Sequence, residues 1–293
     1  MILDFHVHYF SEDYLDNMSH YISLSESRQS LREVIVKNIR RPQGSVPAIE
    51  IYLDGRDSLG IDQCVVFGLA DTPRGCFDLN NRVAELAASR PGEIYGFGTV
   101  PTPRVAEALE EMKRLREDLG FVGIKIYPSL SHLTFCSEQV LELLDCAAQM
   151  DLIVLTDCSF ACWDSPGYLG SDNKFHHLLE ALSRLKRRPR IVAAHLGGGL
   201  VYFKDMYHWA YGEDYFDTLW FDISPFFPAS MIGAALEVVP AERLLFGSDF
   251  PFSSGRENLE SLEQLDLGQE DRARILGDNA RKLLGHDAMG LSG

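Results

Sequence analysis

The sequence predicts an α/β protein built as a single (β/α)8 TIM barrel, and three observations support this prediction. Short apolar runs rich in Val, Ile and Leu alternate eight times with segments of helical periodicity. The chain of 293 residues is somewhat longer than the ~250 residues typical of one such barrel. Polar residues follow many of the strands, and no Gly-x-Gly-x-x-Gly turn marks an open doubly wound sheet. We therefore expect one domain over residues 1–293.

The expected strands are the apolar runs at residues 2–8, 63–69, 94–100, 121–127, 152–156, 190–194, 219–223 and 243–246. Apolar residues at helical spacing predict helices at residues 48–59, 80–89, 103–119, 137–150, 173–186 and 229–238, and two or three more close the chain. Gly60 and Gly120 follow two of these helices, as glycines that end a helix do. The polar stretch at residues 9–47 is too long for a simple loop. We expect it to be an insertion over the barrel mouth, with a helical segment near residues 30–40.

The first strand ends in a His-x-His pair, His6 and His8. Residues two apart in a strand project to the same side, so the two imidazoles should point at one place. Neutral imidazole is the commonest side-chain metal ligand near neutral pH. The pair therefore predicts half of a metal site, whereas the alternative is two polar residues that leave the strand for solvent.

Polar side chains also follow the later strands. Lys125 lies late in the fourth expected strand, Asp157 follows the fifth, His195 the sixth and Asp249 the eighth. In a barrel these positions converge at the carboxyl-terminal mouth, where such enzymes keep their catalytic groups. Asp249 could instead cap a helix, but Phe250-Pro251 follows it rather than a helix start.

Composition and charge exclude several partners. The net charge of −16 argues against nucleic acid or an anionic membrane surface, because both require a basic patch. The six cysteines include no Cys-x-x-Cys pair, which favours buried reduced thiols. No apolar run reaches the ~18 residues of a membrane span, and no signal peptide precedes the first strand. We therefore expect a cytoplasmic protein with a small-molecule substrate, and leave a homodimer open.

Five segments of the chain occur in an order and at a spacing that are specific in combination: His6-x-His8, Gly123-Ile124-Lys125-Ile126-Tyr127-Pro128, Ala194-His195-Leu196-Gly197-Gly198, Gly247-Ser248-Asp249-Phe250-Pro251-Phe252, and Ile275 to Leu284. Together they resemble the amidohydrolase superfamily, and in particular its amidohydrolase-related branch. That branch includes aminocarboxymuconate semialdehyde decarboxylase, resorcylate decarboxylases and various hydrolases. The resemblance extends from residue 2 to about residue 285.

The resemblance implies that His6, His8 and Asp249 bind one divalent metal, usually zinc in this branch. It implies that Asp249 also accepts a proton from metal-bound water, and that His195 faces the substrate. A bound metal lowers the pKa of its water toward ~7, which makes hydroxide available at neutral pH. A nearby carboxylate and imidazole then supply the proton transfers. The structural alternative for His195 is a core histidine.

The chain departs from the family pattern at the fifth strand. Members of the branch have a histidine there, whereas this sequence continues Leu152-Ile153-Val154-Leu155-Thr156-Asp157-Cys158. Asp157 can replace the imidazole as an oxygen ligand, which would shift the metal preference toward manganese or magnesium. Cys158 should point the other way, because it is one residue further along. The remaining alternative is that metal binding is weakened or lost.

The sequence gives less direct evidence for the substrate-binding residues. Lys125 either faces an anionic substrate or is structural, and we favour a single metal over two metals bridged by a modified lysine. Tyr127, Arg74 and Trp163 lie in or beside the predicted mouth loops, with Arg74 available for a carboxylate.

Taken together, the sequence predicts a metal-dependent hydrolase that acts on a small carbonyl- or carboxylate-bearing compound through metal-activated water. The expected metal is one zinc ion, with manganese or magnesium as alternatives. The second expectation is non-oxidative decarboxylation of an aromatic or muconate-like carboxylic acid, because both reactions start from the same site. A third is a metal-poor binding protein without catalysis, which the missing histidine of the fifth strand favours.

Overall fold

The computed structural model describes residues 1–11, 14, 16–22, 49–128, 131, 133–158, 174–203, 209 and 213–285. For residues 174–176, 200, 203 and 213–215 only the backbone is described. Most of the predicted insertion at residues 9–47, including its helical segment at 30–40, lies outside these ranges, as does Trp163.

The described strands are all parallel and follow one another in chain order. They form a three-stranded sheet and a six-stranded sheet, composed of β1 (Ile2–Tyr9), β2 (Ile61–Gly68) and β3 (Ile94–Gly96), and of β4 (Gly98–Thr99), β5 (Gly123–Ile126), β6 (Ile153–Thr156), β7 (Ile191–Ala193), β8 (Leu219–Asp222) and β9 (Leu244–Leu245). The predicted strands are therefore confirmed, with ends that differ by a few residues.

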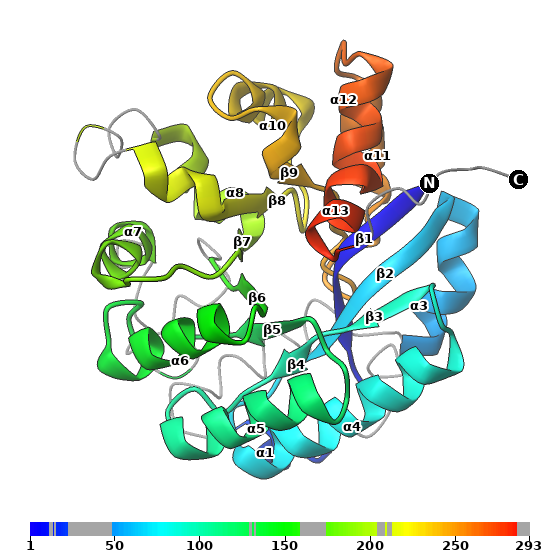
Figure 1. Cartoon of the computed structure of the whole chain (residues 1–293). Coiled ribbons are helices and arrows are strands. Elements are labelled where there is room, and N and C mark those ends of the chain that lie inside the picture. The colour runs from blue at the N-terminus through cyan, green and yellow to red at the C-terminus, as the bar shows by residue number, and fades with distance from the viewer. Residues whose placement is uncertain are drawn as a thin grey trace, which may run out of the picture.

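Backbone hydrogen bonds join the two sheets at both seams. β3 and β4 are parts of one strand interrupted at Phe97, whose N–H donates to Val66 O at 2.9 Å. At the other seam, Phe5 N–H donates to Phe246 O at 2.9 Å, and Asp249 N–H donates to His6 O at 2.8 Å. The strands thus form the parallel barrel that the sequence predicts, with the helices arranged around it (Figure 1).

The described helices are α1 (Met18–Tyr21), α3 (Ile49–Arg56), α4 (Pro73–Ser89), α5 (Val105–Glu117), α6 (Glu138–Gln149), α7 (Lys174–Arg184), α8 (Ala194–Gly198), α10 (Ala229–Leu236), α11 (Arg256–Glu263), α12 (Gln269–Ala273) and α13 (Asn279–Leu283). Short 3-10 segments cover Asp57–Leu59, Leu200–Phe203, Glu213–Thr218 and Ala241–Arg243, and a π-helical turn covers Arg274–Asp278. None of these helices combines the length and apolar character needed to cross a membrane.

One helix begins well before its predicted start. α4 begins at Pro73 rather than near residue 80, because Thr72 caps it: Thr72 Oγ1 accepts a hydrogen bond from Gly75 N–H at 3.0 Å. Proline is well suited to the first helical position, since its missing N–H has no partner to lose there. The Thr72-Pro73 pair was thus a local signal for the true start.

Large side chains fill the interior of the barrel beneath the mouth. The fully buried residues of this cluster include Leu3, Phe5, Val65, Phe67, Phe97, Ile153, Leu155, Val192, Ala194 and Leu245. Phe5 and Phe97 pack edge to face, with ring centroids 5.6 Å apart. Because a filled interior has little freedom to relax, the strand ends above it are held in fixed positions.

An irregularity in β1 aims both histidines at the mouth. Asp4 pairs with Cys64 and Val7 with Val66, so three steps along β1 match two along β2. A bulge of this kind reverses the alternation of side chains. As a result, the consecutive residues Phe5 and His6 both lie on the inner side of the barrel. His8 lies on the same side as His6, and their ring centroids are 5.3 Å apart.

The side chain of Asn80 binds α4 to the barrel, and these hydrogen bonds lead to a prediction about stability. Its buried amide donates to Thr99 O at 2.9 Å and accepts from Thr99 N–H at 2.8 Å. Asn80→Ala should lower the free energy of unfolding by about 2–3 kcal/mol, since buried backbone groups lose their partners. The measurement is a urea denaturation curve.

Asn81→Ala is the matched control, because the half-buried Asn81 side chain accepts one hydrogen bond from Arg114. Its effect should stay within about 0.5 kcal/mol. Equal effects for the two variants would contradict the role given to Asn80.

Candidate active site

A left-handed turn after β7 carries His195 into the barrel mouth. His195 has φ 62°, and the next residues, Leu196 and Gly197, have φ 52° and 64°. Gly198 and Gly199 continue the run with φ 57° and 98°. The three glycines suit this turn, because glycine adopts a left-handed conformation without strain.

Non-glycine residues at positive φ are strained by about 1–3 kcal/mol, and they cluster at functional sites. Asp249, just after β9, is another such residue, with φ 61°. Its N–H donates to His6 O at 2.8 Å, so the seam between β9 and β1 holds the strained residue. Two of the predicted catalytic residues, His195 and Asp249, are therefore in backbone conformations that need support from their surroundings.

His6, His8 and Asp249 bring three ligand-type atoms together. Asp249 Oδ1 lies 3.2 Å from His6 Nε2 and 3.0 Å from His8 Nε2. The ligand atoms of the three buried residues all lie within 4.8 Å of one another. The structure therefore gathers the three residues for which the sequence predicted the metal site.

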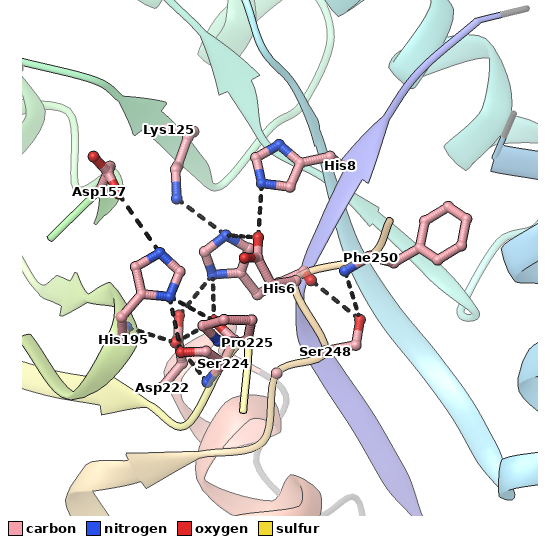
Figure 2. Close-up of polar contacts among 12 residues, drawn as sticks. His6, His8, Lys125, Asp157, His195, Asp222, Ser224, Pro225, Ser248 and Phe250 are labelled. Carbon is pink, nitrogen blue, oxygen red and sulfur yellow. Dashed lines mark hydrogen bonds and ion pairs between the residues drawn. The ribbon is translucent and has the colours of Figure 1, made fainter. Parts of the chain in front are cut away.

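Asp222 is a site residue that the sequence analysis missed. It ends β8, and its Oδ2 lies 2.8 Å from His6 Nδ1 (Figure 2). Its Oδ1 accepts hydrogen bonds from the N–H of His195 at 2.9 Å and from the N–H and hydroxyl of Ser224 at 3.1 and 2.6 Å. An acidic residue that ends the apolar strand Leu219–Asp222 was the signal available for finding it.

The electrostatics keep His6 neutral and its two aspartates ionised. Burial and the nearby positive charge of Lys125 together lower the pKa of His6 to about 4, although Asp222 and Asp249 act in the opposite direction. Burial alone would raise the pKa of Asp222 and of Asp249. Hydrogen bonds and charge interactions outweigh this effect, with His6, His195 and Ser224 around Asp222, and with His6, His8 and His195 around Asp249. The pKa values of both carboxyls therefore lie below the usual range.

This protonation pattern fits a cation between His6 and Asp249. Because Asp222 accepts the Nδ1 proton of neutral His6, the Nε2 atom carries a lone pair. That lone pair faces a carboxylate oxygen of Asp249 at 3.2 Å, an arrangement that a positive charge between them would stabilise. Imidazole nitrogen and carboxylate oxygen are ligands of divalent transition metals, and a carboxylate behind the histidine is a common second partner. His6, His8 and Asp249 could therefore hold such an ion.

His195 makes contacts through both of its ring nitrogens. Nδ1 lies 2.8 Å from Ser224 O, and Nε2 lies 3.5 Å from Asp157 Oδ1. Burial alone would lower the pKa of His195, but the hydrogen bond with Asp157 and the charges of Asp249 and Asp222 leave it above its usual value. The imidazole is thus oriented at both nitrogens and can carry a proton.

Asp157 lies just after the end of β6 and contacts His195 (Figure 2). The group of ligand atoms formed by His6, His8 and Asp249 does not include it. Its role as a metal ligand stays a prediction.

The predicted substrate-binding residues are in different environments. Lys125 is buried, with Nζ 3.3 Å from His6 Nε2, and burial lowers its pKa. Tyr127 is also buried, and its hydroxyl donates to Gly68 O at 3.0 Å. Its ring stacks on His8 at a centroid distance of 6.5 Å. Arg74 is exposed in the first turn of α4.

A parallel α/β barrel with histidines and aspartates gathered at the carboxyl ends of its strands is the architecture of a large class of enzymes. The amidohydrolase family profile matches residues 57–286 of this chain, which is most of its length. The chain belongs to the amidohydrolase superfamily, in the branch that resembles aminocarboxymuconate semialdehyde decarboxylase. The predicted family membership is confirmed, although His6 and His8 precede the matched range.

Two curated relatives are gamma-resorcylate decarboxylases. The one from Rhizobium sp. (strain MTP-10005) is 25% identical over 251 residues, which cover 70% of this chain and 74% of the relative. The one from Rhizobium radiobacter matches with the same identity over the same shares.

Solved structures share the fold at lower identity. The 5-carboxyvanillate decarboxylase from Sphingomonas paucimobilis superposes with a TM-score of 0.79 and 15% identity, covering 97% of this chain and 98% of that one. A dihydroxybenzoic acid decarboxylase from a Polaromonas species, solved with manganese and 2-nitroresorcinol, gives a TM-score of 0.73 at 18% identity. That match covers 100% of this chain and 99% of the other.

The gathered ligand atoms generate a prediction about the metal. Replacing His6 and His8 together by alanine should abolish stoichiometric binding of zinc or manganese, because only Asp249 of the three ligands would remain. Elemental analysis of purified protein measures the metal content. A double variant that keeps one metal ion per chain would show that the ion binds elsewhere.

Proposed function

We propose that this protein is a metal-dependent, non-oxidative decarboxylase of a small aromatic carboxylic acid. The observation that carries the proposal is the match to two gamma-resorcylate decarboxylases over most of the chain, joined to a buried His/Asp site at the barrel mouth. Hydrolysis, the first expectation from the sequence, receives less support, because these relatives break a carbon–carbon bond instead.

The proposed metal ligands are His6, His8 and Asp249. Two neighbouring decarboxylase structures contain manganese, which supports a divalent ion here, while zinc stays a prediction. When bound, such an ion supplies a Lewis acid that withdraws electron density from substrate oxygen atoms. Asp222 contributes by accepting the Nδ1 proton of His6, which keeps Nε2 available as a ligand.

The proposed reaction exchanges the carboxylate of the substrate for a proton. The bond between the ring carbon and the carboxylate breaks, CO2 leaves, and the electron pair of that bond remains on the ring carbon. One proton must reach that carbon, so the site needs a positioned acid.

His195 is the proposed acid. Its Nδ1 is occupied by Ser224 O, so a second proton must reside on Nε2, which faces the mouth beside Asp157. Asp157 stabilises this imidazolium and fixes the ring orientation. Asp249 is the second proposed proton-transfer group, because its carboxylate lies between the imidazoles of His6 and His8. Water then returns the proton to His195 after each turnover.

The proposal generates a prediction for His195. His195→Asn should retain the metal but lower the rate of CO2 release by about 10²–10⁴, the usual effect of losing an acid–base group. The measurement is CO2 release from a panel of ortho-hydroxybenzoates, including 2,6-dihydroxybenzoate, alongside metal analysis.

His177→Asn, on α7, is the control and should leave both quantities unchanged. Loss of metal in His195→Asn would make His195 a ligand instead. Wild-type protein that hydrolyses esters or amides but releases no CO2 would contradict the proposed function.

A further inference from the structure

Lys125 is a buried cation that no carboxylate of the described residues pairs with. It lies on β5 with 1% of its surface exposed. Among the described residues its ammonium forms no ion pair with a carboxylate, and its polar contact is with His6 Nε2 at 3.3 Å. Asp157, Asp222 and Asp249 attract it only at longer range. Buried charges are ordinarily paired, so this ammonium group requires an explanation.

The surroundings of Lys125 hold its charge at the mouth. Nζ lies 4.9 Å from the centre of the Phe67 ring and 5.2 Å from the centre of the Tyr127 ring. Aromatic faces attract a cation, but they do not satisfy its three N–H donors. Both rings are fixed, since Phe67 packs in the barrel interior and the Tyr127 hydroxyl donates to Gly68 O. These rigid neighbours therefore direct the side chain toward the site. Figure 2 shows Lys125 pointing toward His6.

The polar contact that Lys125 makes within the described part of the chain would compete with the proposed metal. Its ammonium faces the same Nε2 lone pair of His6 that would bind the ion. If a metal occupied that lone pair, Lys125 would lose its acceptor, and two positive charges would lie close together. An anion placed beside both of them would satisfy the donors and reduce the repulsion.

We propose that Lys125 binds the carboxylate of the aromatic substrate and selects for carboxylated compounds. This inference rests on the proposed function for the identity of the ligand. Tyr127 and Phe67 hold the ammonium group in place, while His195 and Asp157, at the ends of other strands, serve the proposed proton transfer.

A contact of this kind stabilises bound substrate more than the transition state. Negative charge leaves the carboxylate as the carbon–carbon bond breaks, so the attraction to Lys125 weakens along the reaction. Interactions stronger in the ground state than in the transition state lower KM without raising kcat. Lys125 is thus a specificity-determining residue, and its loss should raise KM while kcat is unchanged or higher.

The decisive test is a binding measurement that does not depend on turnover. Isothermal titration calorimetry of the metal-loaded protein is carried out with benzoate and with benzamide, a neutral compound of nearly the same shape. Lys125→Met, which keeps the length of the side chain but removes the charge, should bind benzoate about 10- to 100-fold more weakly, as expected for a lost charge-assisted hydrogen bond. Its affinity for benzamide should be unchanged.

Two further measurements separate this role from others. Lys113→Met on α5, where the side chain is 65% exposed, is the matched control and should leave benzoate affinity unchanged. Lys125→Met should also retain its metal, because it removes a repelling charge. A carbamate carbon signal from ¹³C-bicarbonate, with loss of metal in Lys125→Met, would make Lys125 a metal ligand and overturn the inference.

The remaining outcomes distinguish the two proposals. Equal benzoate affinity in wild type and Lys125→Met, or no benzoate binding to wild type, would overturn the role of Lys125 even if the protein releases CO2. Selective loss of benzoate binding without any CO2 release from wild type would support the role of Lys125 and contradict decarboxylation.

Discussion

The site depends on the hydrogen bond between His6 Nδ1 and Asp222 Oδ2, 2.8 Å long and fully buried. Asp222 can only accept, so neutral His6 must place its proton on Nδ1 and leave Nε2 free for a cation shared with Asp249. The other oxygen of Asp222 accepts the N–H of His195 and two donors of Ser224. One carboxylate thus sets the protonation of a proposed ligand and also anchors the turn that carries the proposed acid.

The backbone around this carboxylate is irregular in three places: the bulge in β1, the left-handed turn at His195 and the positive φ of Asp249. Such conformations persist only where the surrounding structure holds them. The filled barrel interior and the seam hydrogen bonds supply that support here. The regular barrel thus stabilises the bulge and the two positive-φ segments. These irregular segments in turn direct His6, His195 and Asp249 toward one another.

The barrel could be predicted because buried parallel strands are continuous apolar runs, and the residues that end them converge whatever the loop geometry. This reasoning pointed to His6, His8, His195 and Asp249, which the structure brings to the same mouth as Asp157, while their roles stay predictions. It missed Asp222, because spacing along a strand does not reveal that a distant carboxylate supports a histidine ring. It also missed the start of α4, since the cap at Thr72 outweighed the apolar periodicity. The choice between decarboxylation and hydrolysis depends on the substrate. The residues at the strand ends do not identify that substrate.

The most direct test of this account is the metal affinity of Asp222→Asn. The asparagine amide oxygen can take the place of Oδ1, but its NH2 group would then face His6 Nδ1, and His6 would have to move its proton to Nε2. The account predicts a folded protein with zinc or manganese affinity lowered by about 10- to 100-fold, as for other lost partners of metal-binding histidines. A folded Asp222→Asn protein with wild-type affinity, measured by competition with a chelator, would contradict it.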